Sequence, residues 1–536
     1  MGLFFYKTTT AFSYSNYNCN ILFKGIGLLA LAESMYCFGQ YFGIISSLST
    51  YFAVTGTWAN PNVTALFLAL TVPAFLYLFE TSVKKQAKIG FVLILLALVL
   101  LQCRTAYIGV AIQVIVYYGF KYQFVHWLKD KKNRVGIKAL LIFGLLLIIP
   151  ITTKLYHAKK ASADGRAFIW KVATQMATNK PITGHGYGYF SSHYNAFQSQ
   201  YIQDGKASID ELQNVAAISM PHNEILQQLV EGGSVGLVLM LFFFGSLLFC
   251  TKKPIENSNS TAEKPIPVLQ SNLYALSYAA VVGYIVMSMF NTTLIVAPVM
   301  ALVLIYAAIL TTKQNSIKTI AVKPNNSLKF LFTILTIATS VFVMYVTVPM
   351  AIADRQNKIA FALTTQGNYT EALKLLQKLE PSLRQDSDYW NNIAGVYYKL
   401  QNYPATIIAL NKATALTTDY SFYLGLAKSY HKLGQYPQAI AQYQKLILLK
   451  PSKFSYRFEL MKIYVMQKDS LNALKTAQGI IDLKPKIPSK KVVYYKKMAK
   501  KTRFYYEKLP NKKTIIPKTK LTPQQSNYSF LNPESK

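Results

Sequence analysis

The sequence predicts an all-α protein in two parts: a polytopic helical membrane domain of about nine spans, followed by an α-solenoid. Three observations lead to this prediction. Residues 21–351 contain repeated apolar runs long enough to cross a bilayer, residues 353–486 carry an internal repeat, and the region from residue 352 onward is polar and rich in lysine. The mean hydropathy of +0.22 averages over these two regions.

Nine apolar segments have the length and composition of membrane-spanning helices. They are residues 21–45, 62–80, 88–102, 105–121, 136–153, 232–250, 271–291, 294–312 and 329–351. The first segment is the weakest of them, because Glu33 and Gln40 interrupt it. Residues 1–20 lack the apolar core of a cleavable signal peptide, and we expect them to form a cytoplasmic N-terminal segment.

The distribution of lysine and arginine predicts the orientation of these spans. Basic residues follow the second, fourth, sixth and eighth spans, whereas the connections at 56–62 and 291–293 carry none. The basic loops then all face the cytoplasm. We therefore expect residues 21–351 to form a multi-pass membrane domain, with its large loop of residues 154–231 and the C-terminal region on the side opposite the cytoplasm, which in a bacterium is the periplasm or the exterior.

The net charge of +35 is large, and part of it lies near the C-terminus. Between Lys484 and Lys520 there are 14 lysines and arginines but only one acidic residue, Glu507. We expect residues 487–536 to be a basic, flexible tail that is either simply solvated or attracted to anionic lipid headgroups or an anionic glycan. The predicted orientation keeps this tail away from nucleic acid, so no nucleic-acid partner is expected.

The four cysteines lie in or beside the spans without metal-ligand spacing, which predicts neither a disulfide framework nor a metal site. They are Cys19, Cys37, Cys103 and Cys250.

Residues 353–486 contain four matching segments, which begin 34, 33 and 34 residues apart at Gly367, Gln401, Gly434 and Lys468. Each segment ends in a small residue that allows two helices to pack closely: Ala372, Thr406, Ala439 and Ala473. The pattern resembles tetratricopeptide repeats. Because stacked repeats form a concave surface, we expect residues 353–486 to bind a protein partner.

The loop of residues 154–231 carries most of the candidate functional residues. Arg166 and Trp170 are four residues apart and would share one helix face, beside Lys171. This face could bind an anion, or it could lie on the membrane surface with Phe168, Ile169 and Trp170 as an interfacial anchor. Lys171 is a supporting candidate.

The glycine-rich segment from Gly184 to Phe190 is not a nucleotide loop, because no strand precedes it and the Walker lysine is missing. The glycines instead predict a tight, close-packed turn. His185 could be a ligand, but we interpret His185 and His193 as structural histidines.

The segment from Pro221 to Glu224 opens a predicted helix, with Ser219 as its cap and Pro221 and His222 in the first turn. The positive end of the helix would favour a neutral His222, which can accept a proton from a hydroxyl nucleophile. The alternative is a solvent-exposed histidine at a helix start. Glu224 would complement the helix dipole, and Glu231 would end the helix as a structural or orienting residue.

Arg104 lies at the non-cytoplasmic boundary between the third and fourth spans. An arginine in this place is costly unless it is paired or solvated, which makes it a functional candidate. Its planar fork of donors could hold a phosphate, and the alternative is a side chain that reaches to the interface.

Taken together, these segments resemble the O-antigen ligase and polymerase family of bacterial envelope glycosyltransferases. The resemblance covers about residues 20–310, and the matching segments are Gly56–Asn62, Arg104–Ala106, Arg166…Trp170, Pro181…Phe190 and His222…Gly236. Family members generally have more spans near the N-terminus. The chain therefore resembles a shortened member, or one whose start lies further upstream.

The resemblance implies transfer of a glycan from a polyprenyl-pyrophosphate carrier to an acceptor hydroxyl outside the inner membrane, with no metal, nucleotide sugar or other cofactor. Arg104 and Arg166 would hold the pyrophosphate, and His222 would help to activate the hydroxyl. The resemblance allows a lipid, another glycan or a protein as the acceptor, so O-antigen ligase, polysaccharide polymerase and protein O-oligosaccharyltransferase remain open.

Two readings from other classes also remain. A transporter is disfavoured, because spans two to nine contain no evident buried acid–base pair. A non-catalytic scaffold would act only by recruiting partners through its repeats.

Overall fold

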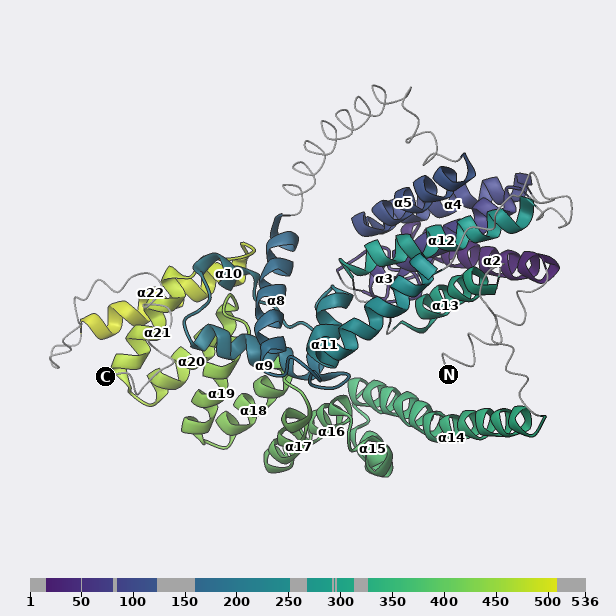
Figure 1. The fold of residues 1–536 in the computed structure, drawn as a ribbon. Helices are drawn as coiled ribbons and strands as arrows, with labels where there is room; N and C mark the ends of the chain where they lie inside the picture. Colours follow the sequence, from purple (N-terminus) through teal and green to yellow (C-terminus); the bar gives the residue numbers. More distant parts are fainter. Residues whose placement is uncertain are drawn as a thin grey trace, which may run out of the picture. The chain divides into compact units, whose positions relative to one another are not determined.

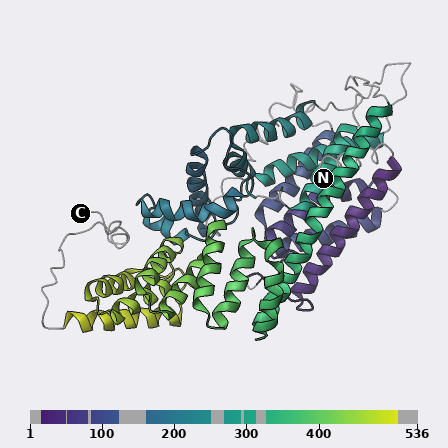
Figure 2. The same ribbon diagram turned by 90° about the horizontal axis from the view of Figure 1, so that it is seen from below.

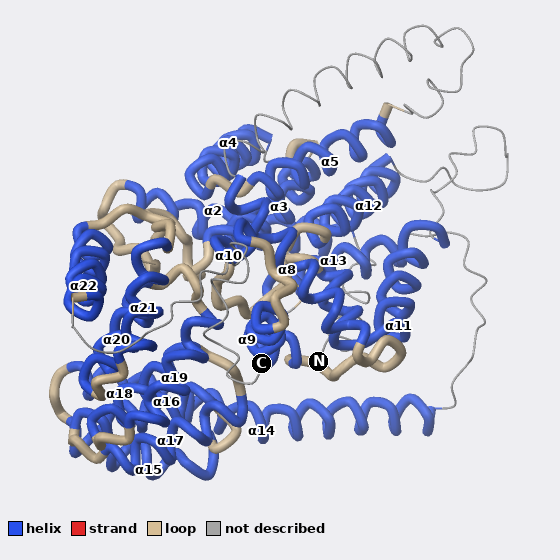
Figure 3. The backbone as a smooth tube through the Cα atoms, turned by 90° about the vertical axis from the view of Figure 1, so that its left-hand side faces the viewer, coloured by secondary structure: helices blue, strands red, loops and turns tan. Residues whose placement is uncertain are grey.

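The computed structural model of the chain describes residues 16–49, 51–80, 84–122, 160–250, 268–291, 294, 296–312 and 326–508. Within these ranges the secondary structure is helical, without a β-strand (Figure 3). The predicted all-α class is therefore confirmed. The chain divides into two compact units, and the second consists of Lys159–Pro181, His185–Met220 and Ala338–Lys536.

The first unit, here called the membrane unit, is a bundle of apolar helices (Figure 1). Its helices are α2 (Asn16–Tyr41), α3 (Pro61–Leu78), α4 (Lys84–Leu101), α5 (Arg104–Lys121), α11 (Glu224–Gly245), α12 (Val268–Ser288), α13 (Ala297–Thr312) and the start of α14 (Asn326–Thr365). A short π-helix, η2 (Ser246–Cys250), continues α11.

Four helical segments among the described residues are long and apolar enough to cross a membrane: Cys19–Tyr41, Pro61–Leu78, Glu224–Phe249 and Ile337–Thr365. Shorter apolar segments lie in α12 and α13. Eight of the nine expected spans coincide with helices, whereas the expected span 136–153 lies outside the described residues. The chain is a membrane protein, and the count of nine spans stays a prediction.

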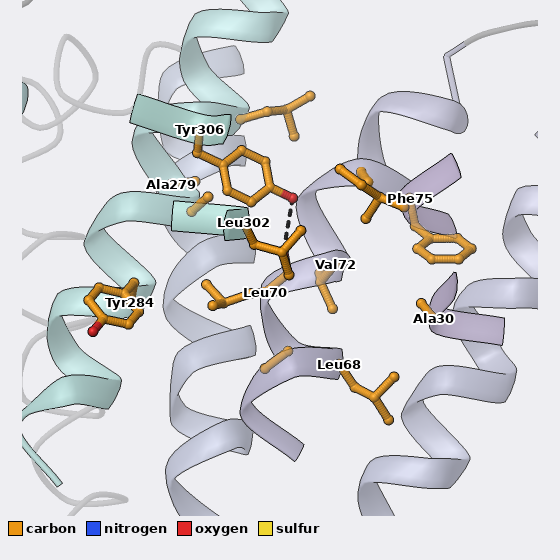
Figure 4. Packing of buried hydrophobic residues seen from close by; sticks show 14 of the residues in the cluster. Ala30, Leu68, Leu70, Val72, Phe75, Ala279, Tyr284, Leu302 and Tyr306 are labelled. Carbon is orange, nitrogen blue, oxygen red and sulfur yellow. Dashed lines mark hydrogen bonds between the residues drawn. The ribbon is translucent and has the colours of Figure 1, made fainter. Parts of the chain in front are cut away.

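Helix α3 forms the centre of the membrane unit. Every residue from Val63 to Leu78 is buried. A helix that is apolar on all faces is buried in this way when other helices surround it in a bundle. Small residues such as Ala30 of α2 and Ala279 of α12 belong to the same core, where they let helices approach closely (Figure 4). The Tyr306 hydroxyl of α13 donates to the Leu70 carbonyl of α3 at 2.8 Å, and this bond satisfies a polar group in the apolar core.

The second unit contains the C-terminal repeats as four helical hairpins that stack in sequence order, green to yellow in Figure 2. The end of α14 pairs with α15 (Tyr369–Leu383). The later hairpins are α16 (Ser387–Lys399) with α17 (Tyr403–Leu416), α18 (Tyr420–Lys432) with α19 (Tyr436–Leu449), and α20 (Phe454–Met466) with α21 (Ser470–Asp482). The small residues predicted at the helix contacts are all buried: Ala372, Thr406, Ala439 and Ala473.

The four hairpin turns share one backbone geometry. The first residue of each repeated segment has a left-handed φ: 91° at Gly367, 60° at Gln401, 72° at Gly434 and 57° at Lys468. The following amide donates to a carbonyl five residues back, as Asn402 does to Tyr397 at 2.9 Å. This pattern ends a helix in a Schellman motif, which explains the glycines at two of the four positions.

The basic segment 487–536 differs from our expectation of a flexible tail. Its residues Lys490–Glu507 form α22, and residues 509–536 lie outside the described residues. Val492, Tyr495 and Ala499 recur at helical spacing and pack against α20 and α21. This apolar stripe, in which Ala499 is buried and Val492 and Tyr495 are partly buried, packs on the last repeat and stabilises a helix that lysine content alone does not predict.

We predict that Gln401→Gly stabilises the α16–α17 hairpin by about 1 kcal/mol, because a left-handed conformation is strained in glutamine but not in glycine. Hydrogen exchange of amides in this hairpin should slow by roughly fivefold. Gln401→Ala is the matched control and should give no such gain, since alanine has the same conformational strain. Equal exchange in the glycine variant and the native protein would contradict the prediction.

Candidate functional site

The connection between α2 and α3 is held by two polar residues of α2. Glu33 is buried, and its carboxylate accepts hydrogen bonds from the Thr57 amide at 2.8 Å and the Thr57 hydroxyl at 2.9 Å. The Gln40 side-chain oxygen accepts from the amides of Thr55 and Gly56, both at 2.8 Å. Glu33 and Gln40, which interrupt the first predicted span, therefore hold the start of the segment Gly56–Asn62 in place. Their spacing of seven residues puts both on one helix face, and this spacing was the feature of the sequence that could have predicted their shared role.

Arg104 is the first residue of α5 and is half-buried. The tight connection before it contains Gln102, with φ 50°, and Cys103, which caps the helix without a side-chain hydrogen bond. The first backbone amides of α5 and the side chain of Arg104 thus come from the same end of the helix. The amides attract an anion through the helix dipole, and the guanidinium attracts it through its charge and its fork of hydrogen-bond donors.

His222 lies outside the helix that we predicted it to begin. Helix α11 starts at Glu224, and the Asn223 side chain caps it by accepting from the Leu226 amide at 2.9 Å. Ser219 is therefore not the cap, and Pro221 is not in the first turn. The backbone of His222 has φ 54°, which a right-handed helix does not admit. A half-buried, non-glycine residue in this conformation is strained, and such residues concentrate at functional sites.

Glu224 and Glu231 are both buried on α11, with 2% of each residue exposed. The Glu224 carboxylate accepts a hydrogen bond from the Leu294 amide at 2.7 Å, which ties the start of α11 to the connection between α12 and α13. The Glu231 carboxylate accepts from the Gln227 side chain at 3.3 Å. These bonds offset the cost of burying carboxylates, and they hold the helix end beside His222 in place.

Sequence reasoning missed Asn291, at the start of the connection that Glu224 holds. Asn291 is 3% exposed, and its side-chain nitrogen has no hydrogen-bond partner among the described residues. A buried donor of this kind is costly and is more often found at a polar site than in an apolar core. Its only sequence signal was a polar residue at the end of a predicted span.

The glycine-rich segment makes the predicted close contact through Gly184. A Cβ atom on Gly184 would lie 2.4 Å from the Gly233 nitrogen, and one on Gly233 would lie 2.3 Å from the Ile182 oxygen. The Val235 amide also donates to the Ile182 carbonyl at 3.2 Å. Gly233 has φ 62° within α11, so this helix is kinked two residues after Glu231 rather than ended there.

Arg166, Trp170 and Lys171 lie on α8 (Lys160–Thr178) of the second unit, where Arg166 and Trp170 are half-buried. The Lys171 ammonium pairs with Glu211 of α10 (Ile209–Asn214) at 2.8 Å, and this hydrogen bond raises the pKa of Lys171. Lys171 thus has a structural contact, and its supporting role stays a prediction.

Phe168 and Ile169 of the same helix are only 2% and 6% exposed. They pack inside the second unit. They therefore do not form the interfacial anchor on the membrane surface, which was one of the two alternatives for this helix face.

His185 and His193 stack on the two faces of Tyr189, with ring centroids 4.2 Å and 3.9 Å apart. His185 also contacts the Met176 carbonyl through Nε2 at 3.0 Å, and His193 contacts the Ser192 hydroxyl at 2.7 Å. The interpretation of both residues as structural is supported by these contacts.

The large loop packs on the repeats through α9 (Tyr189–Gln203), which lies against α19 (Figure 1). The Thr418 amide donates to the Ser192 carbonyl at 3.0 Å, and the Asn195 side chain donates to the Thr418 carbonyl at 3.1 Å. A polar groove of about 350 Å³ runs along this contact, lined by residues 191, 195, 217–219, 388, 417–419, 421 and 422. Sequence reasoning missed the contact, because its hydrogen bonds join polar groups that lie far apart in the sequence.

The predicted site residues fall into two groups. Arg104, His222, Glu224 and Glu231 belong to the membrane unit, whereas Arg166 and Lys171 belong to the second unit.

Residues 89–241 match the sequence profile of a family described as O-antigen ligase. The matched range begins in α4 and ends in α11, so it contains Arg104, Arg166 and His222. Residues 352–379 and 420–453 match tetratricopeptide-repeat profiles and correspond to the first and third repeats. These matches confirm both resemblances that the sequence predicted.

Three curated relatives are proteins named provisionally as polysaccharide ligases. The protein of Rickettsia felis is 31% identical over 142 residues, which cover 25% of this chain and 28% of the relative. Those of Rickettsia conorii and Rickettsia prowazekii are 29% and 28% identical over 139 residues, covering 25% of this chain and 28% and 29% of the relatives. The similarity is thus confined to less than a third of each protein.

We predict that Gly184→Ala destabilises the membrane unit by at least about 2 kcal/mol, because the new methyl group would force the backbones of residues 184 and 233 apart. The melting temperature of the purified protein should fall. Gly186→Ala is the matched control, since Gly186 also has a positive φ but no atom within 4 Å of an added Cβ. Similar losses in the two variants would show that backbone strain, and not the close contact, limits stability.

Proposed function

We propose that this protein transfers a glycan from a polyprenyl-pyrophosphate carrier to an acceptor hydroxyl at the non-cytoplasmic face of the bacterial inner membrane. The observation that carries the proposal is the strained backbone of His222, which directly precedes the cap of α11 and lies inside the range that matches the O-antigen ligase profile. The orientation rests on the basic loops, all of which fall on one side of the predicted spans.

In the proposed reaction, the acceptor oxygen attacks the anomeric carbon of the glycan. The bond from that carbon to the pyrophosphate oxygen breaks, and the carrier leaves as polyprenyl pyrophosphate. Neutral His222 takes the proton of the acceptor hydroxyl as a general base. The negative charge that grows on the leaving pyrophosphate is stabilised by Arg104 and the first amides of α5.

The surroundings of His222 support this role. Asn223 and Glu224, the next two residues, are fixed by hydrogen bonds at 2.9 Å to Leu226 and 2.7 Å to Leu294. A base held by rigid neighbours needs little reorganisation when the hydroxyl approaches. Glu231 is proposed to support the same helix, and Arg166 is proposed to bind an anionic group of the donor, as the family resemblance implies.

The acceptor class can be decided from the fate of the glycan in a strain that lacks the gene. Full-length glycan that stays unattached indicates a ligase, single repeat units indicate a polymerase, and proteins that lose sugar indicate protein transfer. A ligase is the favoured outcome, because the matched profile and the named relatives are described as ligases.

The second candidate function is transport, and one observation is relevant to it. Glu80 at the end of α3 forms an ion pair with Lys121 of α5 and accepts from the Tyr117 hydroxyl at 2.7 Å, so an acid–base pair is present. Both charged side chains are partly exposed, at 23% and 34%, and lie at helix ends, where pairs of this kind are structural. Solute uptake by reconstituted vesicles without any lipid-linked glycan would favour the transporter.

We predict that His222→Asn lowers the rate of glycan transfer by at least about a hundredfold, because asparagine tolerates the left-handed backbone but cannot act as the base. His222→Ala should have the same effect. Transfer is measured with lipid-linked glycan and purified protein, and the melting temperature is measured alongside. His431→Asn in the repeats is the control and should transfer normally. Normal transfer by His222→Asn would remove His222 from the mechanism.

We predict that Arg104→Lys lowers transfer by at least about tenfold although the charge is kept, since a lysine cannot form the two parallel hydrogen bonds of a guanidinium. Arg355→Lys on the exposed surface of α14 is the matched control and should leave transfer unchanged. If Arg104→Lys were fully active, Arg104 would contribute only charge or packing.

A further inference from the structure

The outer face of α22 combines lysines with exposed apolar side chains. Val492, Tyr495 and Ala499 point to the repeats, as described above. The opposite face carries Val493, which is 68% exposed, and Phe504, which is 59% exposed. Between them lie Lys497, Lys500 and Lys501, all exposed, and we call these five residues the α22 outer face.

This face is strongly basic. Helix α22 contains seven lysines and arginines and one acidic residue, Glu507, which pairs with Arg503 at 2.7 Å. Across the part of the chain that the structure describes, Lys497, Lys500 and Lys501 form no ion pair. Their charges are close together and uncompensated, so the face attracts anions.

The same face also carries exposed apolar side chains, which the binding of a soluble anion would not require. The lysine side chains and the two apolar residues line a shallow depression of about 560 Å³, together with Lys496. Tyr494 and Tyr505 beside it are 53% and 62% exposed, and the Lys508 ammonium lies 4.2 Å from the centre of the Phe504 ring. Rings and aliphatic side chains among lysines are typical of helices that lie in the headgroup region of a bilayer.

We propose that the α22 outer face binds the surface of a membrane that contains anionic phospholipid. The lysines contact phosphate headgroups, while Val493 and Phe504 enter the interface between headgroups and acyl chains. Helix α14 contains a segment, Ile337–Thr365, that is long and apolar enough to cross a membrane, and the same helix leads without a break into the first repeat, which would keep the repeats tethered to a membrane. The proposal does not depend on the transfer reaction.

The test uses the full-length protein in nanodiscs of phosphatidylcholine, mixed with vesicles of phosphatidylcholine alone or with an equal part of phosphatidylglycerol. The protein should float with the anionic vesicles only, and added salt should release it. Lys497→Glu/Lys500→Glu/Lys501→Glu should weaken this binding by about a hundredfold. Val493→Ala/Phe504→Ala should weaken it by about tenfold with the charge unchanged.

The matched control is Lys374→Glu/Lys378→Glu/Lys432→Glu, which changes the net charge equally at exposed lysines elsewhere in the repeats. This variant should bind nearly as well as the native protein. The proposal is overturned if the control loses binding as strongly as the α22 variant, or if either α22 variant binds normally. It is also overturned if vesicles with and without phosphatidylglycerol bind equally, or if a soluble acidic polysaccharide binds the protein while the anionic vesicles do not. An unchanged melting temperature shows that each variant is folded.

Discussion

The arrangement of the candidate site depends on the contact between two backbones at Gly184 and Gly233. No side chain can lie between them, since an added Cβ on either glycine would be within 2.5 Å of backbone atoms of the other segment. The contact fixes the kink in α11, and the first turns of this helix, which carry Glu224 and Glu231, take their direction from it. Ile182 to Gly184 belong to the membrane unit, although the residues on both sides belong to the second unit. This short piece of the large loop is thereby part of the helix bundle.

Buried polar residues secure the other connections of the membrane unit. Glu33, Gln40 and Glu224 are each 7% exposed or less, and each accepts backbone amide hydrogen bonds from a connecting segment. A buried carboxylate is unfavourable in an apolar bundle unless it has such donors, so these residues specify which loop lies at which helix. The membrane unit is thus built from apolar helices. A few hydrogen bonds from buried polar side chains hold the segments that connect these helices in place.

The sequence predicted the elements whose signals are local. The repeat turns follow from a segment that recurs at Gly367, Gln401, Gly434 and Lys468, because the left-handed residue and the small residue after it lie within six positions of each other. The predicted cap of α11 was wrong by four residues, because Ser219 and Asn223 are both good caps and only the backbone of His222 decides between them. The three-dimensional structure was needed for that choice.

The contact between α9 and the repeats could not be predicted in this way. It joins Asn195 and Thr418, which are 223 residues apart, through a hydrogen bond between two buried polar residues. Helix α22 was missed for the opposite reason, since its lysines dominate the composition and hide the stripe that contains Val492 and Ala499. Long-range polar contacts and short apolar stripes leave little trace in composition or hydropathy.

The contact of α9 with the repeats also changes how the scaffold hypothesis should be judged. Ser192 and Asn195 lose hydrogen-bond partners when residues 353–536 are deleted, and the polar groove beside them loses one wall. Loss of function in such a truncation would therefore follow from a disturbed loop as well as from a lost partner. Substitutions at His222 leave the repeats and α9 intact, so they separate a catalytic loop from a recruiting solenoid where deletion does not.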